Sequence, residues 1–188
     1  MLYAPDNGLT ELTLTDATNL MQLIVPGNAL TALDLSGVPV LEELNCSDNQ
    51  LTALTTGDCP NLVSLDCANN QITSILTSKN TALQILNCAG NKLTALGVSS
   101  KEIKAVWCQN NQLTKIVLST GADPQQLVAF NNQITTLNLT GKANLQELWL
   151  DNNALTTLDI SGSSVRTLSA SNNKLTSITH NTDDKKSM

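Results

Sequence analysis

The fold is decided by the stretch LEELNCSDNQLTAL at residues 41–54, because the same arrangement of aliphatic residues around one asparagine recurs along nearly the whole chain. In this stretch Leu51 stands two residues after the asparagine, Thr52 follows directly, and Leu54 comes two residues later. The repeating unit reads L-x-x-L-x-(C/A/V/L)-x-x-N-x-L-T-x-L. Its asparagines recur at intervals of 20 or 21 residues: Asn7, Asn28, Asn49, Asn70, Asn91, Asn111, Asn132, Asn153 and Asn173. These positions predict a repeat architecture of about nine coils, of which the first is partial.

The residues before each asparagine alternate between apolar and polar, as in Leu65-Asp66-Cys67. A period of two is typical of a short strand, and the Asn, Asp, Gly and Ser residues that separate these stretches are typical of turns. A single unit cannot bury its apolar side, whereas stacked units share one core and pair their strands in parallel, about 4.8 Å apart. The sequence therefore predicts a solenoid of short parallel strands.

With these units the chain resembles a bacterial leucine-rich repeat protein with 21-residue repeats of the internalin type, over about residues 2–180. Its most specific feature is a column similar to the cysteine ladder of one internalin subgroup: Cys46, Cys67, Cys88 and Cys108. The flanking coils hold other residues in this column: Ala4, Val25, Ala129, Leu150 and Ala170. The resemblance implies a curved right-handed solenoid of the α/β horseshoe type, mostly of short parallel strands with little helix. It divides the chain into a leucine-rich repeat domain at residues 1–180 and a polar tail at 181–188.

Composition excludes several classes of function. The formal net charge is -6 and only ten residues are Lys or Arg, whereas binding to a phosphate backbone requires clustered cations. Nucleic acid is therefore not an expected partner. No stretch reaches 18 apolar residues, so no transmembrane segment is expected, and the first residues do not read as a signal peptide.

The cysteines admit three interpretations. The four in the column replace Ala, Val or Leu of other coils, which favours small buried hydrophobic residues. Oxidation between neighbouring coils is an alternative, although parallel side chains meet the disulfide torsion poorly. Zinc is a further alternative, but a row of cysteines does not make a tetrahedral cluster, and we expect no metal. Cys59 stands in Asp58-Cys59-Pro60, which reads as a turn, and is expected to be the most reactive thiol.

The invariant polar columns are expected to be structural. An asparagine after every strand is explained by hydrogen bonds to backbone groups that the turn leaves unpaired. The threonine that follows in each coil, such as Thr52, favours a hydroxyl ladder on strand-like backbone. Ice binding would need two ranks of threonine, but the second rank is Leu or Ile, which we expect to point inward.

The chain offers little for catalysis. His180 is its only histidine and lies in the last coil, so no nucleophile, base and orienting group converge in one pocket. The carboxylates Glu42, Glu43 and Asp48 can share one face, but paired-acid chemistry also needs a cleft that separates their pKa values. The prediction is a protein that is not an enzyme and needs no cofactor.

One surface combines all four aromatic residues of the chain, because the residues that flank the inward aliphatics of each strand face outward. In the horseshoe this is the concave face, where solenoids bind partners. The predicted ligand-binding residues are Trp107, Val128, Phe130, Trp149, Lys104, Glu147 and Asp151. Trp107 and Trp149 lie two coils apart, with Val128 between them, which predicts an exposed apolar patch with charged neighbours.

The sequence thus predicts a non-enzymatic module that binds a protein through its concave face. The resemblance to internalin-type proteins implies an extracellular or cell-surface bacterial protein used in adhesion or host contact. The stacking of repeats leads us to expect further repeats or a cap outside this chain, because end coils need shielding. A carbohydrate-binding module that stacks sugars on Trp107 and Trp149 is the first alternative, and a passive spacer within a longer surface protein is the second.

Overall fold

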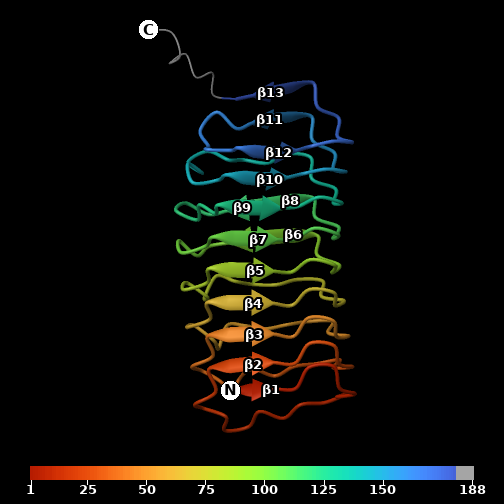
Figure 1. Ribbon diagram of the computed structural model, residues 1–188, viewed down its shortest axis with the longest axis vertical. Coiled ribbons are helices and arrows are strands. Elements are labelled where there is room, and N and C mark those ends of the chain that lie inside the picture. Colours follow the sequence, from red (N-terminus) through yellow and green to blue (C-terminus); the bar gives the residue numbers. More distant parts are fainter. Residues whose placement is uncertain (181–188) are drawn as a thin grey trace.

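Nine short strands lie side by side and form one parallel sheet along the whole molecule (Figure 1). The structure is a computed structural model that describes residues 1–180, so the tail expected at 181–188 lies outside the described residues. The strands of the sheet follow one another in the order β1 (Leu2–Tyr3), β2 (Gln22–Ile24), β3 (Glu43–Asn45), β4 (Ser64–Asp66), β5 (Ile85–Asn87), β7 (Ala105–Trp107), β9 (Gln126–Val128), β10 (Glu147–Trp149) and β12 (Thr167–Ser169). The predicted solenoid of about nine coils is confirmed.

The segments that return behind the sheet are turns and short strands. Residues 1–180 contain no helix, so nothing in this part of the chain is a helix that could cross a membrane. We call this side, formed by the segment after each repeated threonine, the back of the solenoid. The outward surface of the nine-stranded sheet is called the strand face.

Alternation along each strand separates the core from the strand face. The middle residues, such as Leu44, Leu65 and Leu86, are fully buried, whereas their neighbours in β3, β4 and β5 are half-buried or exposed. Removing a leucine side chain from water stabilises the fold by about 1.5–3 kcal/mol. A shift of one residue in register would turn every such leucine outward, so burial of this row holds the coils in register.

The asparagine column fixes the same register through hydrogen bonds. In a central coil the Asn91 side-chain nitrogen donates to the carbonyl oxygens of Cys67, Cys88 and Ala89, at 3.0, 3.2 and 3.1 Å. Its Oδ1 accepts the backbone N–H of Ile72 at 2.9 Å. From Asn28 onward each such amide joins its own turn to the preceding coil, and the predicted structural role of the column is confirmed.

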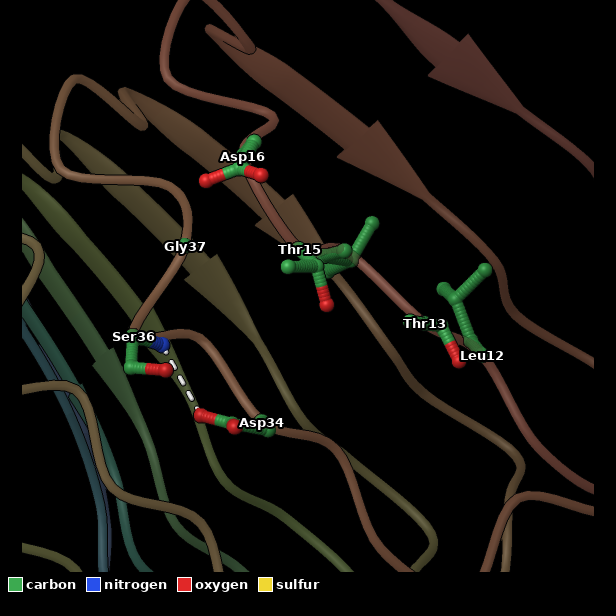
Figure 2. A pocket seen from close by; sticks show the side chains of 8 residues that line it. Leu12, Thr13, Thr15, Asp16, Asp34, Ser36 and Gly37 are labelled. Atoms are coloured by element: carbon green, nitrogen blue, oxygen red, sulfur yellow. Dashed lines mark hydrogen bonds between the residues drawn. The ribbon is translucent and has the colours of Figure 1, made fainter.

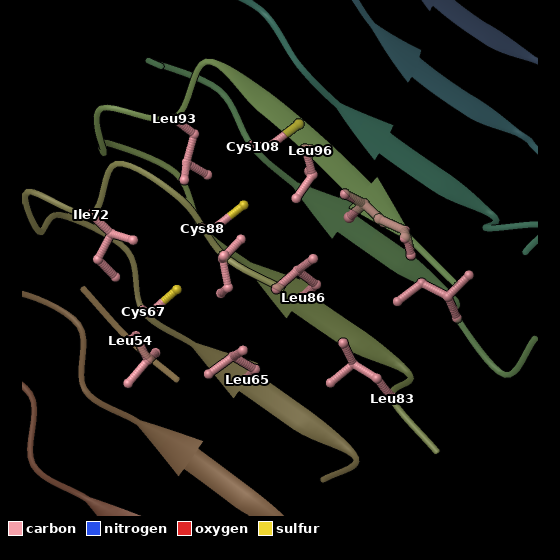
Figure 3. Packing of buried hydrophobic residues seen from close by; sticks show 14 of the residues in the cluster. Leu54, Leu65, Cys67, Ile72, Leu83, Leu86, Cys88, Leu93, Leu96 and Cys108 are labelled. Carbon is pink, nitrogen blue, oxygen red and sulfur yellow. The ribbon is translucent and has the colours of Figure 1, made fainter. Parts of the chain in front are cut away.

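The cysteine column lies inside the core, where Cys67, Cys88 and Cys108 are seen among buried leucines (Figure 3). Cys46, Cys67, Cys88 and Cys108 are buried with free thiols, as expected of small hydrophobic residues. Burial raises the pKa of the Cys46 and Cys88 thiols to about 12. It raises the pKa of Cys67 and Cys108 well above the ordinary value.

Of the five thiols, Cys59 has the pKa that burial raises least, in agreement with its expected rank, but it is not exposed to solvent. Its side chain is fully buried, and burial raises its pKa to about 11, so the nucleophilic thiolate is scarce at neutral pH. The Cys59 thiol lies 3.8 Å from the carbonyl oxygen of Val38, which is the buried residue at the same position one coil earlier. The turn is real, but this position of the turn points into the core.

The back carries two separate strand pairs. β6 (Ala95–Val98) pairs with β8 (Lys115–Leu118), and β11 (Thr157–Asp159) pairs with β13 (Ser177–Thr179). Both pairs join coils whose asparagines are 20 residues apart, namely Asn91 with Asn111 and Asn153 with Asn173. In residues 1–180 the coils with 21-residue intervals have no such pair on the back. A 20-residue interval between asparagines therefore coincides with a strand pair on the back. The hollows on the back lie between coils whose asparagines are 21 residues apart.

Candidate functional site

The strand face presents one continuous row of side chains across all nine strands. Parallel pairing puts the last residue of each strand beside its equivalents in the neighbouring strands: Tyr3, Ile24, Asn45, Asp66, Asn87, Trp107, Val128, Trp149 and Ser169. This is the row that the repeat predicts. Because adjacent strands are about 4.8 Å apart, neighbours in the row are in contact range.

Four residues form the apolar part of this surface, which we call the tryptophan patch: Trp107, Val128, Phe130 and Trp149. In the register of β7, β9 and β10, Val128 lies between the two tryptophans. Trp149 is 36% exposed, and Trp107, Val128 and Phe130 are half-buried. Each of the four side chains is thus partly open to solvent.

A chain of hydrogen bonds holds the patch across three strands. The indole Nε1 of Trp107 donates to Oε1 of Gln126, and Nε2 of Gln126 donates to Oε2 of Glu147 at 2.6 Å. Both acceptors belong to strands next to the donor's strand. Sequence reasoning missed this link, because register places the residues close together but does not fix the direction of their side chains. The bond from Nε1 ties the Trp107 indole to β9.

The charged residues differ in their roles around the patch. Glu147 and Asp151 stand two residues before and after Trp149 and so flank it on the same face. Burial alone would raise the pKa of Asp151, but hydrogen bonds from Ser169 and Ser171 outweigh it and lower the pKa, so the carboxylate is ionised at neutral pH. Lys104 instead donates to Oε1 of Gln84 at 2.7 Å, toward the preceding coil and away from Val128.

A ladder of exposed asparagines borders the patch, and sequence reasoning missed it. Three bonds join the series Asn110, Asn131, Asn152 and Asn172: the side-chain amide of each of the last three donates to Oδ1 of the one before it, at 2.6 to 2.8 Å. All four have a positive φ, between 54 and 56°. The signal was present, because every coil has Asn, Asp or Gly directly before its invariant asparagine, and these residues tolerate the left-handed conformation best.

Four hollows lie on the back of the solenoid, and their linings contain no residue of the strand face. Figure 2 shows one hollow of about 400 Å³, where Oδ1 of Asp34 accepts the N–H of Ser36 at 2.9 Å. This hollow and three others are lined by back segments and by none of the residues of the tryptophan patch. The patch is thus separate from these four hollows.

No site for a metal ion was found among the described residues, since His, Cys, Asp and Glu do not cluster in threes within residues 1–180. The carboxylates Glu42, Glu43 and Asp48 lie on or beside β3, and Glu42 and Asp48 are exposed to solvent. What the strand face offers is apolar contact, hydrogen bonding and negative charge.

Comparisons with known proteins identify the repeat. The family model described as "Leucine Rich repeats (2 copies)" matches residues 39–80 and 60–101, and the model "Leucine Rich Repeat" matches residues 144–165. No curated protein matches the chain significantly.

Among solved structures, the functional domain of InlJ from Listeria monocytogenes is 33% identical, with a TM-score of 0.86 over 92% of this chain and 39% of that one. That domain is described as including a cysteine ladder. YopM from Yersinia enterocolitica is 24% identical, with a TM-score of 0.67, over 91% of this chain and 41% of that one. The leucine-rich repeat domain of APL1 is 20% identical, with a TM-score of 0.74, over 83% of this chain and 44% of that one. The last two show the fold alone, and the chain spans about 40% of the length of these structures.

Proposed function

Because this chain is a leucine-rich repeat protein with repeats of the internalin type, we propose that it binds a protein partner through the tryptophan patch of its strand face. Domains of this family commonly serve protein–protein interaction. The proposal also includes a non-enzymatic role in adhesion or host contact, at a bacterial surface or after secretion. This location is supported by the resemblance to internalin-type proteins. The chain spans 39% of the matched InlJ domain, so any partner of a complete protein of this kind is proposed here and not inferred from that match.

The observation that carries the proposal is the partly exposed row of Trp107, Val128 and Trp149 in a chain with very few aromatic residues. Tryptophan is enriched among residues that dominate the energy of protein interfaces. An apolar patch surrounded by polar groups is typical of an interaction surface. The hydrogen-bonded position of Trp107 adds to this, because a ring that is already ordered loses less entropy on binding.

The charges around Trp149 favour a partner with a basic side chain. Glu147 and Asp151 place a carboxylate on either side of the exposed indole along the strand direction. A guanidinium or ammonium group over the indole face would gain a cation–π contact and a carboxylate neighbour together. Glu43 and Asp66 continue the acidic character along the strand face toward the first coils. A basic segment of the partner can therefore lie across several coils.

Replacing Trp107 and Trp149 by alanine is expected to weaken binding to the purified partner by at least about 30-fold, which corresponds to the 2 kcal/mol of an interface hot spot. The partner is first captured on the immobilised protein, then purified, and its affinity is measured by calorimetry. Leu76→Ala is the matched control, because Leu76 is a 78% exposed aliphatic residue on the back and its removal should leave the affinity unchanged.

The same variants separate the alternatives. A glycan array probed with the wild type and the double variant tests the carbohydrate-binding function, which predicts glycan binding that the double variant loses. Partner affinity that is equal in the wild type and the double variant would overturn the proposed site. If neither proteins nor glycans distinguish the two, the passive spacer explains the chain better.

A further inference from the structure

A lysine is buried on the back of the solenoid, away from the tryptophan patch. Lys142 is only 4% exposed, and its Nζ donates to the carbonyl oxygen of Ser119 at 3.0 Å. An ammonium group has three N–H donors, so this contact accounts for one of them. A buried cation without a matching anion is costly, which makes Lys142 unusual for a position in a packed turn.

The fold does not require a lysine at this position. In this turn the backbone N–H of Lys142 donates to the carbonyl oxygen three residues earlier, and the same bond identifies the equivalent position in other coils. The residues at that position are all neutral: Ala17, Val38, Cys59, Asn80, Ala122 and Ser163. Asn80 is the closest analogue, because its amide donates to the carbonyl oxygens of Thr56 and Cys59 at 2.9 and 2.8 Å. A neutral amide thus satisfies turn carbonyls from this position, and the positive charge of Lys142 is left without a structural reason.

Lys142 borders a hollow whose polar lining is rich in donors. The hollow has a volume of about 230 Å³, between β8 and the segment that follows it in the next coil. Its polar lining residues are Lys115, Thr136, Asn138, Thr140 and Lys142. Oδ1 of Asn138 already accepts the N–H of Thr140 at 2.9 Å, so the amide has its N–H groups left to offer. No carboxylate lines this hollow, although the chain as a whole is acidic.

We propose that this hollow binds an oxyanion, a sulfate or carboxylate group, between Lys142 and Lys115. Two ammonium groups supply the charge, and hydroxyl and amide N–H or O–H donors match the several acceptor oxygens of such a group. The volume of about 230 Å³ has room for a compact anion. The site is independent of the proposed function of the tryptophan patch, because it lies on the other side of the solenoid.

The test is calorimetric titration of the protein with sodium sulfate and, separately, with sodium glucuronate, at constant ionic strength in chloride. Sulfate represents a free inorganic anion and glucuronate a carboxylate carried by a sugar, so the two titrations distinguish the sources. Lys142→Met keeps the buried stem and removes the charge, and it is expected to weaken binding of the preferred anion by at least about tenfold, as for the loss of a charge-assisted hydrogen bond. Lys115→Ala is expected to weaken the same binding several-fold.

Lys92→Ala is the control, because Lys92 is exposed in another coil and bonds to Gln71. Its affinity for both anions should equal that of the wild type. If Lys142→Met does not fold, the exposed Lys115 still provides the test. The proposal is overturned if the wild type binds neither anion at millimolar concentration, which would leave Lys142 as a cap on Ser119 only. It is also overturned if Lys115→Ala and Lys92→Ala bind the anions as the wild type does.

Discussion

The protein is expected to lose stability steeply above pH 9, because all five cysteine thiols are buried in the folded state. Burial raises the pKa of Cys59 to about 11 and that of Cys46 and Cys88 to about 12, and the pKa values of Cys67 and Cys108 also lie well above the ordinary value of 9.0. In the unfolded chain the thiols ionise near that ordinary value. Their contribution to stability is therefore complete below pH 9 and is lost as the pH rises through the raised values of the folded state.

The size of this effect follows from proton linkage. Between the unfolded and folded pKa values each thiol removes about 1.4 kcal/mol from the free energy of unfolding per pH unit, so five together approach about 7 kcal/mol per unit. Because domains are stable by only about 5–15 kcal/mol, one to two pH units above 9 should unfold the protein. Urea denaturation followed by circular dichroism at pH 8, 9, 9.5 and 10 measures the slope.

A variant with one buried thiol fewer provides the control for the pH dependence. Cys67→Ala removes a titrating group and keeps a small apolar side chain, as in the coil that has Ala129 in this column. Its slope above pH 9 should be lower than that of the wild type by about one fifth. Equal slopes in the two proteins would mean that the cysteine column does not cause the loss.

Replacing Asn91 by alanine is expected to lower the free energy of unfolding by about 3 kcal/mol. The change removes three hydrogen bonds to carbonyl oxygens and leaves the N–H of Ile72 unpaired in a buried position. A buried polar group without a partner costs about 1–3 kcal/mol, and water cannot replace the amide without opening the contact between two coils. Chemical denaturation of the variant at neutral pH measures the loss.

Asn7→Ala is the matched control, because Asn7 belongs to the same column in the first coil. Its side chain is exposed and donates to the carbonyl oxygen of Pro5 at 2.7 Å. Water can take over this contact, so the loss should be about 0.5 kcal/mol. If Asn91→Ala were as stable as Asn7→Ala, the hydrogen bonds of the asparagine column would not hold neighbouring coils together.

The repeat predicts the strands and their register because it constrains every coil in the same way. An aliphatic residue at a fixed place in each unit has one way to be buried, so Leu44, Leu65 and Leu86 are placed in one row by the sequence alone. The consequence for the surface follows directly, since the residue after each of them must face outward. This is why the repeat pattern by itself predicts the row that contains Trp107, Val128 and Trp149.

Features that depend on a single coil are less accessible to sequence reasoning. Cys59 looks exposed between an aspartate and a proline, and only its alignment with the buried Val38 reveals the burial. Asn80 is likewise fully buried behind a turn that looks polar, where its Oδ1 accepts the hydroxyl of Thr56 at 2.7 Å. In both cases the residues at the same position of neighbouring coils predict burial better than the local composition does.

Side-chain directions and hollows could not be predicted. The intervals of 20 residues are visible in the sequence, but their effect on the back of the solenoid depends on how two coils meet in space. The bond from Gln126 to Glu147 needs a choice of rotamer in each residue. The cavity beside Lys142 arises where two coils separate on the back, which the unit pattern does not encode.

Successive coils place side chains from distant parts of the sequence on one exposed surface, and the proposed binding site depends on this arrangement. A nuclear Overhauser spectrum of protein labelled at the valine methyl groups tests it, with attention to Val128. We expect cross-peaks from its methyl groups to side-chain protons of both Trp107 and Trp149, because these residues pair in register on either side of it. Cross-peaks to only one tryptophan, or to neither, would contradict the shared surface and the binding site built on it.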